Sequence, residues 1–169
     1  MYKKCKKEEI IMISYKEGNK KFNFRVGAII INEDKILIHR KEKYEFWLLP
    51  GGRVEMLEGT DETICRELKE ELNLEVVTER LGVVSENFFQ LGETIYHEIG
   101  FNYIVMIKGK SDITEKEGEF HGEEGEEFLY KWCKIENLNK VGFRPEFMIG
   151  ILKNLPQNVV HIIKNELLK

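Results

Sequence analysis

Three glutamates fall on one stripe of a short predicted helix. Glu67, Glu70 and Glu71 follow the i, i+3, i+4 spacing that gathers side chains on one helical face. Like charges at this distance repel one another, and a divalent cation turns the repulsion into attraction. Because all these ligand atoms are oxygens, the stripe favours a hard cation such as Mg²⁺ or Mn²⁺ over zinc.

A tight glycine turn precedes the helix. The turn, Leu49-Pro50-Gly51-Gly52, follows an apolar run, and its glycines let backbone groups approach an ion or a phosphate closely. Glu58 ends the loop that follows, and Arg66 stands just before the acidic stripe, where it can pair with a carboxylate. The helix alone is equally well interpreted as an exposed, solvated face. The turn, Glu58 and Arg66 at fixed offsets favour a metal site instead.

The helix itself has recognisable ends. Thr60 is the expected N-cap, because its hydroxyl can accept a free backbone N–H, and Asn73 is the expected stop in a left-handed conformation. The side chains expected to face a core at helical spacing are Ile64, Cys65, Leu68 and Leu72.

The spaced residues between Gly52 and Leu74 resemble the signature of the Nudix hydrolases. That signature reads Gly, five residues, Glu, seven residues, Arg-Glu, an aliphatic residue, any residue, Glu-Glu, any residue, Gly and an aliphatic residue. The matching positions are Gly52, Glu58, Arg66, Glu67, Leu68, Glu70, Glu71 and Leu74. Asn73 replaces the family's second Gly, and both residues tolerate a left-handed helix end.

The resemblance implies a fold and a reaction. The implied fold is α/β (α+β), an α/β/α sandwich with a mixed β-sheet between helices. The implied enzyme is a Mg²⁺-dependent hydrolase of phosphoanhydride bonds. Its substrate would be a nucleoside diphosphate linked to another moiety: a nucleotide sugar, an ADP-ribose-like compound or a nucleoside triphosphate. Two alternatives stay open, namely a catalytically silent Nudix-fold domain that senses a nucleotide and a plain cation-binding protein.

The expected catalytic and metal-binding groups are mostly acidic. The glutamates of the stripe would hold the cation, and by resemblance the Gly51 carbonyl would be a further ligand. Gly52, Glu58 and Arg66 are expected to be structural. The base would be Glu71 or a glutamate from the acidic segment 111–127, because crowding among carboxylates can raise a pKa. The expected catalytic residues are Glu67, Glu70, Glu71, Glu124 and Glu127.

The acidic segment has two interpretations. Because it lacks hydrophobic periodicity and contains three glycines, it is expected to be a mobile, solvated loop. One glutamate near its end would still reach the metal cluster, and the choice lies among Glu123, Glu124, Glu126 and Glu127, with Glu124 and Glu127 preferred.

Substrate contacts are expected from Arg25 and Arg40, in addition to the backbone at Gly52. Both arginines flank the predicted strands that lead to the glycine turn, and a guanidinium fork suits phosphate oxygens. Trp47 could stack on a base, but its apolar neighbours favour core packing.

Length and composition point to one domain over residues 1–169, with residues 1–9 as a flexible tail. The net charge of −4 gives no case for binding nucleic acid or a membrane surface. Three scattered cysteines suit reduced thiols in the cytoplasm. No apolar run reaches the length of a membrane span. A monomer and a homodimer both stay open.

Hydrophobic patterning predicts strands before and after the signature, and one more helix. Strands are expected over 10–15, 22–31, 35–40, 75–84, 94–108 and 128–135. A helix is expected over 145–152, with Pro145 in its first turn. The segment 159–164 is compatible with either a strand or a helix.

Overall fold

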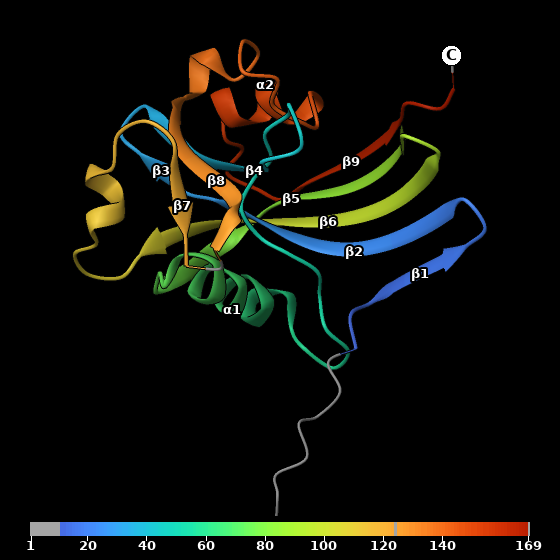
Figure 1. Ribbon diagram of the computed structural model, residues 1–169, viewed down its shortest axis with the longest axis horizontal. Helices are drawn as coiled ribbons and strands as arrows, with labels where there is room; N and C mark the ends of the chain where they lie inside the picture. The colour runs from blue at the N-terminus through green and yellow to red at the C-terminus, as the bar shows by residue number, and fades with distance from the viewer. Residues whose placement is uncertain (1–10, 124, 169) are drawn as a thin grey trace, which may run out of the picture.

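Two helices lie on opposite sides of the β-structure in the computed structural model (Figure 1). Residues 11–123 and 125–168 are described, so the expected tail over 1–9 and Glu124 lie outside the described residues. The elements are β1 Ser14–Glu17, β2 Lys20–Ile29, β3 Ile31–Asn32, β4 Lys35–Lys41, α1 Thr60–Leu72, β5 Val76–Leu91, β6 Thr94–Ile107, η1 Asp112–Glu115, β7 Phe120–Gly122, β8 Gly125–Lys134, η2 Ile135–Asn137, α2 Phe147–Lys153 and β9 Val160–Asn165.

The strands form two sheets rather than one. The larger sheet has the order β1-β2-β6-β5-β9 and is mixed, because β2 runs parallel to β6 and β5 runs parallel to β9. The smaller sheet has the order β3-β4-β8-β7 and is antiparallel. The predicted α+β sandwich with a mixed sheet between helices is confirmed, and the second sheet is an addition to it.

Strand alternation divides the core between the two helices. On β4, Leu37 packs on the side of α1, whereas Ile36 and Ile38 pack on the side of α2. The α1 cluster contains Ile64 and Leu68, both fully buried as the helical spacing predicts. The continuous apolar run at the end of β2 follows from this arrangement, because both faces of that strand are covered.

The predicted C-terminal end of α1 is confirmed, whereas its predicted N-cap is not. Asn73 adopts the left-handed conformation (φ 51°), and its N–H donates to carbonyls of the last turn. At the other end the prediction is wrong, because Gly59 is the N-cap and Thr60 is the first helical residue. The Gly59 N–H donates to the Glu62 carboxylate at 3.1 Å. The Thr60 hydroxyl instead shares a 2.7 Å hydrogen bond with the hydroxyl of Tyr103.

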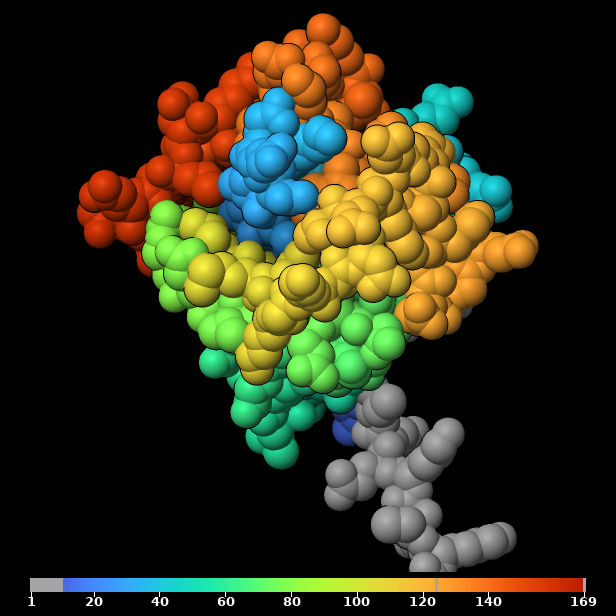
Figure 2. Space-filling view, turned by 90° about the vertical axis from the view of Figure 1, so that its left-hand side faces the viewer, coloured from blue at the N-terminus to red at the C-terminus, as the bar shows by residue number. Residues whose placement is uncertain are grey.

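The prediction of a loop over 111–127 is wrong in most of its length, because the segment contains η1, β7 and the start of β8. Most of its side chains are exposed, as expected for a solvated segment. Ile113 is buried, and its carbonyl accepts a 2.7 Å hydrogen bond from the Trp132 indole. The segment lies beside the β3–β4 turn (Figure 2), where the Asn32 amide donates to the carbonyl of Thr114 at 3.5 Å. These anchors come from distant strands, so a local sequence window could not reveal them.

The boundaries of several other elements differ from the predicted ones by a few residues or more. Strand β1 begins at Ser14 rather than residue 10, and β5 continues to Leu91, well beyond the expected end at 84. The segment 159–164 is a strand, because it pairs in parallel with the far half of β5. Helix α2 begins at Phe147, after the expected Pro145. Over the described part of the chain, no helix combines the length and apolar character needed to cross a membrane.

Candidate active site

Arg66 ties the loop before α1 to the acidic stripe of the helix. Its guanidinium contacts Glu58 at 2.8 and 3.0 Å, and a third nitrogen contacts both Glu67 and Glu70 at 3.1 Å. A carboxylate oxygen of Glu55 lies 3.4 Å from a nitrogen of the same guanidinium. Hydrogen bonding to Glu58 is the main reason that the pKa of Arg66 is raised. The guanidinium is therefore always charged and braces the loop against the helix.

Glu58 is the matching acidic end of this brace. The bond from Arg66 holds the pKa of Glu58 below its ordinary value, although its partial burial acts in the opposite direction. The Thr63 hydroxyl also donates to Glu58 at 2.8 Å. All these contacts join the loop to the first turns of the helix, as expected for a structural rather than a chemical role.

The three glutamates of the stripe have different surroundings. Glu67 and Glu71 are buried, with only 9% and 3% of their surface exposed, whereas half of the Glu70 side chain is exposed. Glu71 also lies 3.8 Å from the Nδ1 atom of His39 on β4, a neighbour that sequence reasoning missed. Glu67 is paired with Arg66, and burial sets Glu67 and Glu71 apart from the exposed Glu70 as the carboxylates that a cation could reach beside the glycine turn.

The glycine turn is pressed between β2 and α1. Gly51 has a φ of 134°, and an added Cβ would lie 2.4 Å from the Val26 carbonyl oxygen. A Cβ on Gly52 would lie 2.1 Å from the carboxyl carbon of Glu67. Since no side chain fits at either position, Gly51 lies directly against the backbone of β2, and Gly52 brings the backbone directly against the buried Glu67 carboxylate.

The donor set fits a hard divalent cation in its chemistry and in its crowding. It consists of the buried Glu67 and Glu71 carboxylates and the Gly51 carbonyl of the adjoining glycine turn. Arginines engage part of this set, because Arg66 contacts Glu67 and Arg25 donates to the Gly51 carbonyl at 3.3 Å. Across residues 11–123 and 125–168, no three His, Cys, Asp or Glu side chains already converge as a metal cage.

The turn between β7 and β8 is fastened to the end of α1. The N–H of Glu123 donates to the Glu71 carbonyl at 2.8 Å, and a Cβ on Gly122 would lie 2.3 Å from the same oxygen. The acidic segment is thus held beside the helix. The Glu127 carboxylate pairs with Lys41 at 2.8 Å, and this bond lowers the pKa of Glu127.

The two arginines expected at the substrate have different positions. Arg25 reaches the Gly51 carbonyl and also lines a pocket beside the turn. Arg40 does not line that pocket. It donates to two backbone carbonyls of the loop after β4, at 3.0 and 2.9 Å, and stacks over the Trp47 ring at 5.2 Å. Trp47 is buried, in agreement with the core role expected for it.

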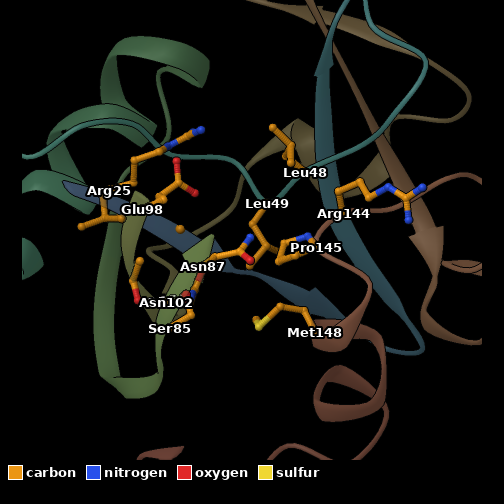
Figure 3. A pocket seen from close by; sticks show the side chains of 13 residues that line it. Arg25, Leu48, Leu49, Ser85, Asn87, Glu98, Asn102, Arg144, Pro145 and Met148 are labelled. Atoms are coloured by element: carbon orange, nitrogen blue, oxygen red, sulfur yellow. Dashed lines mark hydrogen bonds between the residues drawn. The ribbon is translucent and has the colours of Figure 1, made fainter. Parts of the chain in front are cut away.

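The pocket lies on the α2 side of the larger sheet (Figure 3). Its floor is polar, and its wall is formed by apolar side chains that face the floor. The floor residues are Arg25, Gly27, Ser85, Asn87, Glu98, Gly100 and Asn102, and the wall includes Leu48, Leu49, Pro145 and Met148. Sequence reasoning missed this floor. Its signal is the spacing of two between small or polar residues in β5 and β6, which marks one face of each strand.

Asn87 is the most unusual residue of the floor. Only 7% of its surface is exposed, and its side-chain oxygen is buried without a hydrogen-bond partner in the described part of the chain. Asn102, by contrast, donates to the Val83 carbonyl at 3.4 Å. Because buried polar atoms are nearly always paired, an unpaired oxygen beside a pocket is what a polar ligand would satisfy.

Known proteins resemble this chain over most of its length. The family model of the NUDIX domain matches residues 21–154. An 8-oxo-dGTP diphosphatase of Buchnera aphidicola subsp. Schizaphis graminum is 32% identical, over 73% of this chain and 85% of that protein. The 8-oxo-dGTP diphosphatase of Escherichia coli K12 is 30% identical, over 80% of this chain and 99% of that protein. The structure of an ADP-ribose pyrophosphatase from Streptococcus suis matches with a TM-score of 0.57 at 14% identity. The match covers 84% of this chain and 98% of that one, and it shows a shared fold.

Proposed function

This chain belongs to the Nudix hydrolase family, and we propose that it uses Mg²⁺ to cleave a pyrophosphate bond in a nucleoside diphosphate linked to another moiety. Arg25 carries the proposal, because the same side chain lines the pocket and donates to the carbonyl of the glycine turn. A substrate whose base enters the pocket would therefore extend its phosphates toward the buried glutamates.

A nucleoside triphosphate with a purine base is the substrate class that we favour. Two relatives that are at least 30% identical are named 8-oxo-dGTP diphosphatases. The pocket supports this choice, because the apolar side chains of Leu49 and Met148 suit the face of a planar base. The Asn87 amide suits its polar edge. Nucleotide sugars and ADP-ribose are the competing classes.

The chain's own residues would divide the work at the phosphates. Glu67, Glu71 and the Gly51 carbonyl would hold the cation, and Arg25 would donate to a phosphate oxygen as it does to Gly51. The bound cation would neutralise charge on the phosphates and lower the pKa of the attacking water. The proton of that water would pass to Glu71 or to a glutamate of the β7–β8 turn.

The brace formed by Glu58 and Arg66 would not take part in chemistry. Glu58 and Arg66 hold the loop against α1, and so keep the glycine turn at its place beside Glu67. Cys65 and Cys133 are free thiols, which supports a reducing compartment such as the cytoplasm.

A substrate panel tests this function. Purified protein is incubated with 8-oxo-dGTP, dGTP, ADP-ribose and a UDP-sugar, with Mg²⁺ or with EDTA, and the products are separated by ion-exchange chromatography. We expect Mg²⁺-dependent cleavage, with a nucleoside triphosphate preferred in kcat/KM. Tight nucleotide binding by calorimetry without turnover of any compound would identify a silent sensor and overturn the proposal.

A further inference from the structure

His39 is a buried imidazole directly behind Glu71. It lies in the middle of β4, with only 2% of its surface exposed. Its Nδ1 atom is buried and has no hydrogen-bond partner among the residues that the structure describes. The acidic oxygen that it faces is Oε1 of Glu71, 3.8 Å away. An unpaired buried nitrogen destabilises the fold, and an apolar residue at this position would not have that cost.

The surroundings fix the ring where it is. It stacks on Phe128, with 5.5 Å between ring centres and 13° between planes, and packs against Tyr130 at 5.5 Å. The backbone of His39 exchanges two hydrogen bonds with Leu48, at 2.9 and 2.8 Å. The imidazole is thus held between β4 and β8 and cannot turn away from Glu71 without disturbing both strands.

The ring can present a hydrogen at Nδ1 in either charge state. A charged imidazolium carries a hydrogen on both nitrogens. A neutral imidazole carries a hydrogen on one nitrogen and a lone pair on the other. A lone pair on Nδ1 would face a carboxylate unfavourably, whereas an N–H there would be attracted to it. The contact therefore favours the tautomer with the proton on Nδ1.

We propose that His39 is a positioning residue for Glu71: its Nδ1–H is directed at one carboxylate oxygen and leaves the other to face the cation. The gap of 3.8 Å is longer than a hydrogen bond, and a small rotation of the Glu71 side chain toward Nδ1 would close it. Partners of this kind, which orient a ligand from behind, commonly change metal affinity or activity by about 10- to 100-fold when they are removed. The inference rests on the proposed function only in treating Glu71 as a ligand.

The first test reads the tautomer directly in the metal-free protein. Nitrogen-15 NMR of labelled protein distinguishes a protonated Nδ1 from a protonated Nε2. We expect the His39 resonances to show the proton on Nδ1. A proton on Nε2 alone overturns the proposal, because Nδ1 then has nothing to donate.

The second test separates donation from packing. His39→Leu keeps an apolar volume without a donor, and His39→Gln restores a donor. Mn²⁺ affinity is measured by electron paramagnetic resonance. The kinetic constants kcat and KM are measured with the preferred substrate. We expect His39→Leu to weaken Mn²⁺ binding and lower kcat about 10- to 100-fold with KM changed by less than about 3-fold. His39→Gln should recover most of both losses.

Leu37→Ala is the matched control, because Leu37 is buried on the same face of β4 and offers no donor. It should lower the melting temperature and leave Mn²⁺ affinity intact. Wild-type Mn²⁺ affinity in His39→Leu overturns the proposal. If His39→Leu does not fold, His39→Gln and the tautomer decide. If the proposed function fails, no compound of the panel is cleaved, while the tautomer and the Mn²⁺ affinities still show whether His39 positions Glu71.

Discussion

The acidic site, formed by the glycine turn, Glu67 and Glu71, and the pocket beside it are built in opposite ways. The acidic site comes almost entirely from one contiguous stretch, Gly51 to Glu71, and its geometry is set by charged contacts within that stretch. The pocket is assembled from three strands, two loops and helix α2, and its floor is mostly neutral amides, a hydroxyl and glycines. Arg25 is the side chain that touches both. We infer that reaction chemistry and substrate choice can be changed separately in this molecule.

The largest effect should come from removing one charge in the acidic site. Glu71→Gln keeps the shape of a buried side chain but removes the anion that would bind the cation or accept the proton. We expect kcat to fall by about 10²- to 10⁴-fold, while KM changes little. Steady-state kinetics measure this, and circular dichroism checks the fold. Full activity in this variant and in Glu70→Gln would show that the reaction does not depend on the glutamates of the stripe.

The next effect should come from filling the space beside Glu67. In Gly52→Ala the new Cβ would lie 2.1 Å from the Glu67 carboxyl carbon, so that carboxylate must move. A misplaced catalytic group of this kind can cost about 100-fold in kcat/KM. Gly150→Ala in α2 is the control, because nothing lies within 4 Å of its added Cβ. Equal activities for the two variants would show that the close approach at Gly52 has no role.

A smaller effect, confined to substrate choice, should follow a change in the pocket. Asn87→Ala removes the buried amide and its unpaired oxygen. We expect KM for the preferred nucleotide to rise about 5- to 20-fold at nearly constant kcat, because one hydrogen bond to the base is lost. Gln90→Ala, exposed on the same strand, should leave KM unchanged. A fall in kcat alone would connect Asn87 to the chemistry and contradict the separation of the two regions.

The smallest effect should appear in stability as the pH falls. The folded-state pKa of Glu58 lies below its ordinary value of 4.5, because Arg66 bonds to the ionised carboxylate. Its contribution is therefore complete above about pH 4.5 and is lost as the pH falls through the lowered pKa. The melting temperatures of wild type and Glu58→Gln should differ at pH 7 and converge in acid. A constant difference from pH 7 to pH 3 would contradict this assignment.

The same contrast explains what the sequence could predict. The signature residues act within one helix and its preceding loop, so their spacing alone predicted the helix, its stop at Asn73 and the grouping of Glu67 and Glu71. The N-cap was placed one residue late, because Thr60 bonds to Tyr103, a partner that only the tertiary fold supplies.

The pocket and the acidic segment could not be predicted in this way. Ser85 and Asn102 reach one floor only because β5 and β6 pair with a particular register. The acidic segment is ordered by contacts with Trp132 and Asn32, far away in the sequence. Of the two acidic-segment residues preferred as catalytic, Glu127 is bound to Lys41, and Glu124 lies outside the described residues and stays a prediction.

Locating the cation tests the central claim most directly. Crystals grown with Mn²⁺ and measured at the manganese absorption edge would give the position of the ion from anomalous scattering. We predict an ion about 2.0–2.3 Å from oxygens of Glu67, Glu71 and the Gly51 carbonyl. A well-occupied Mn²⁺ elsewhere, with Glu67 still bonded to Arg66 and Glu71 unliganded, would contradict the account.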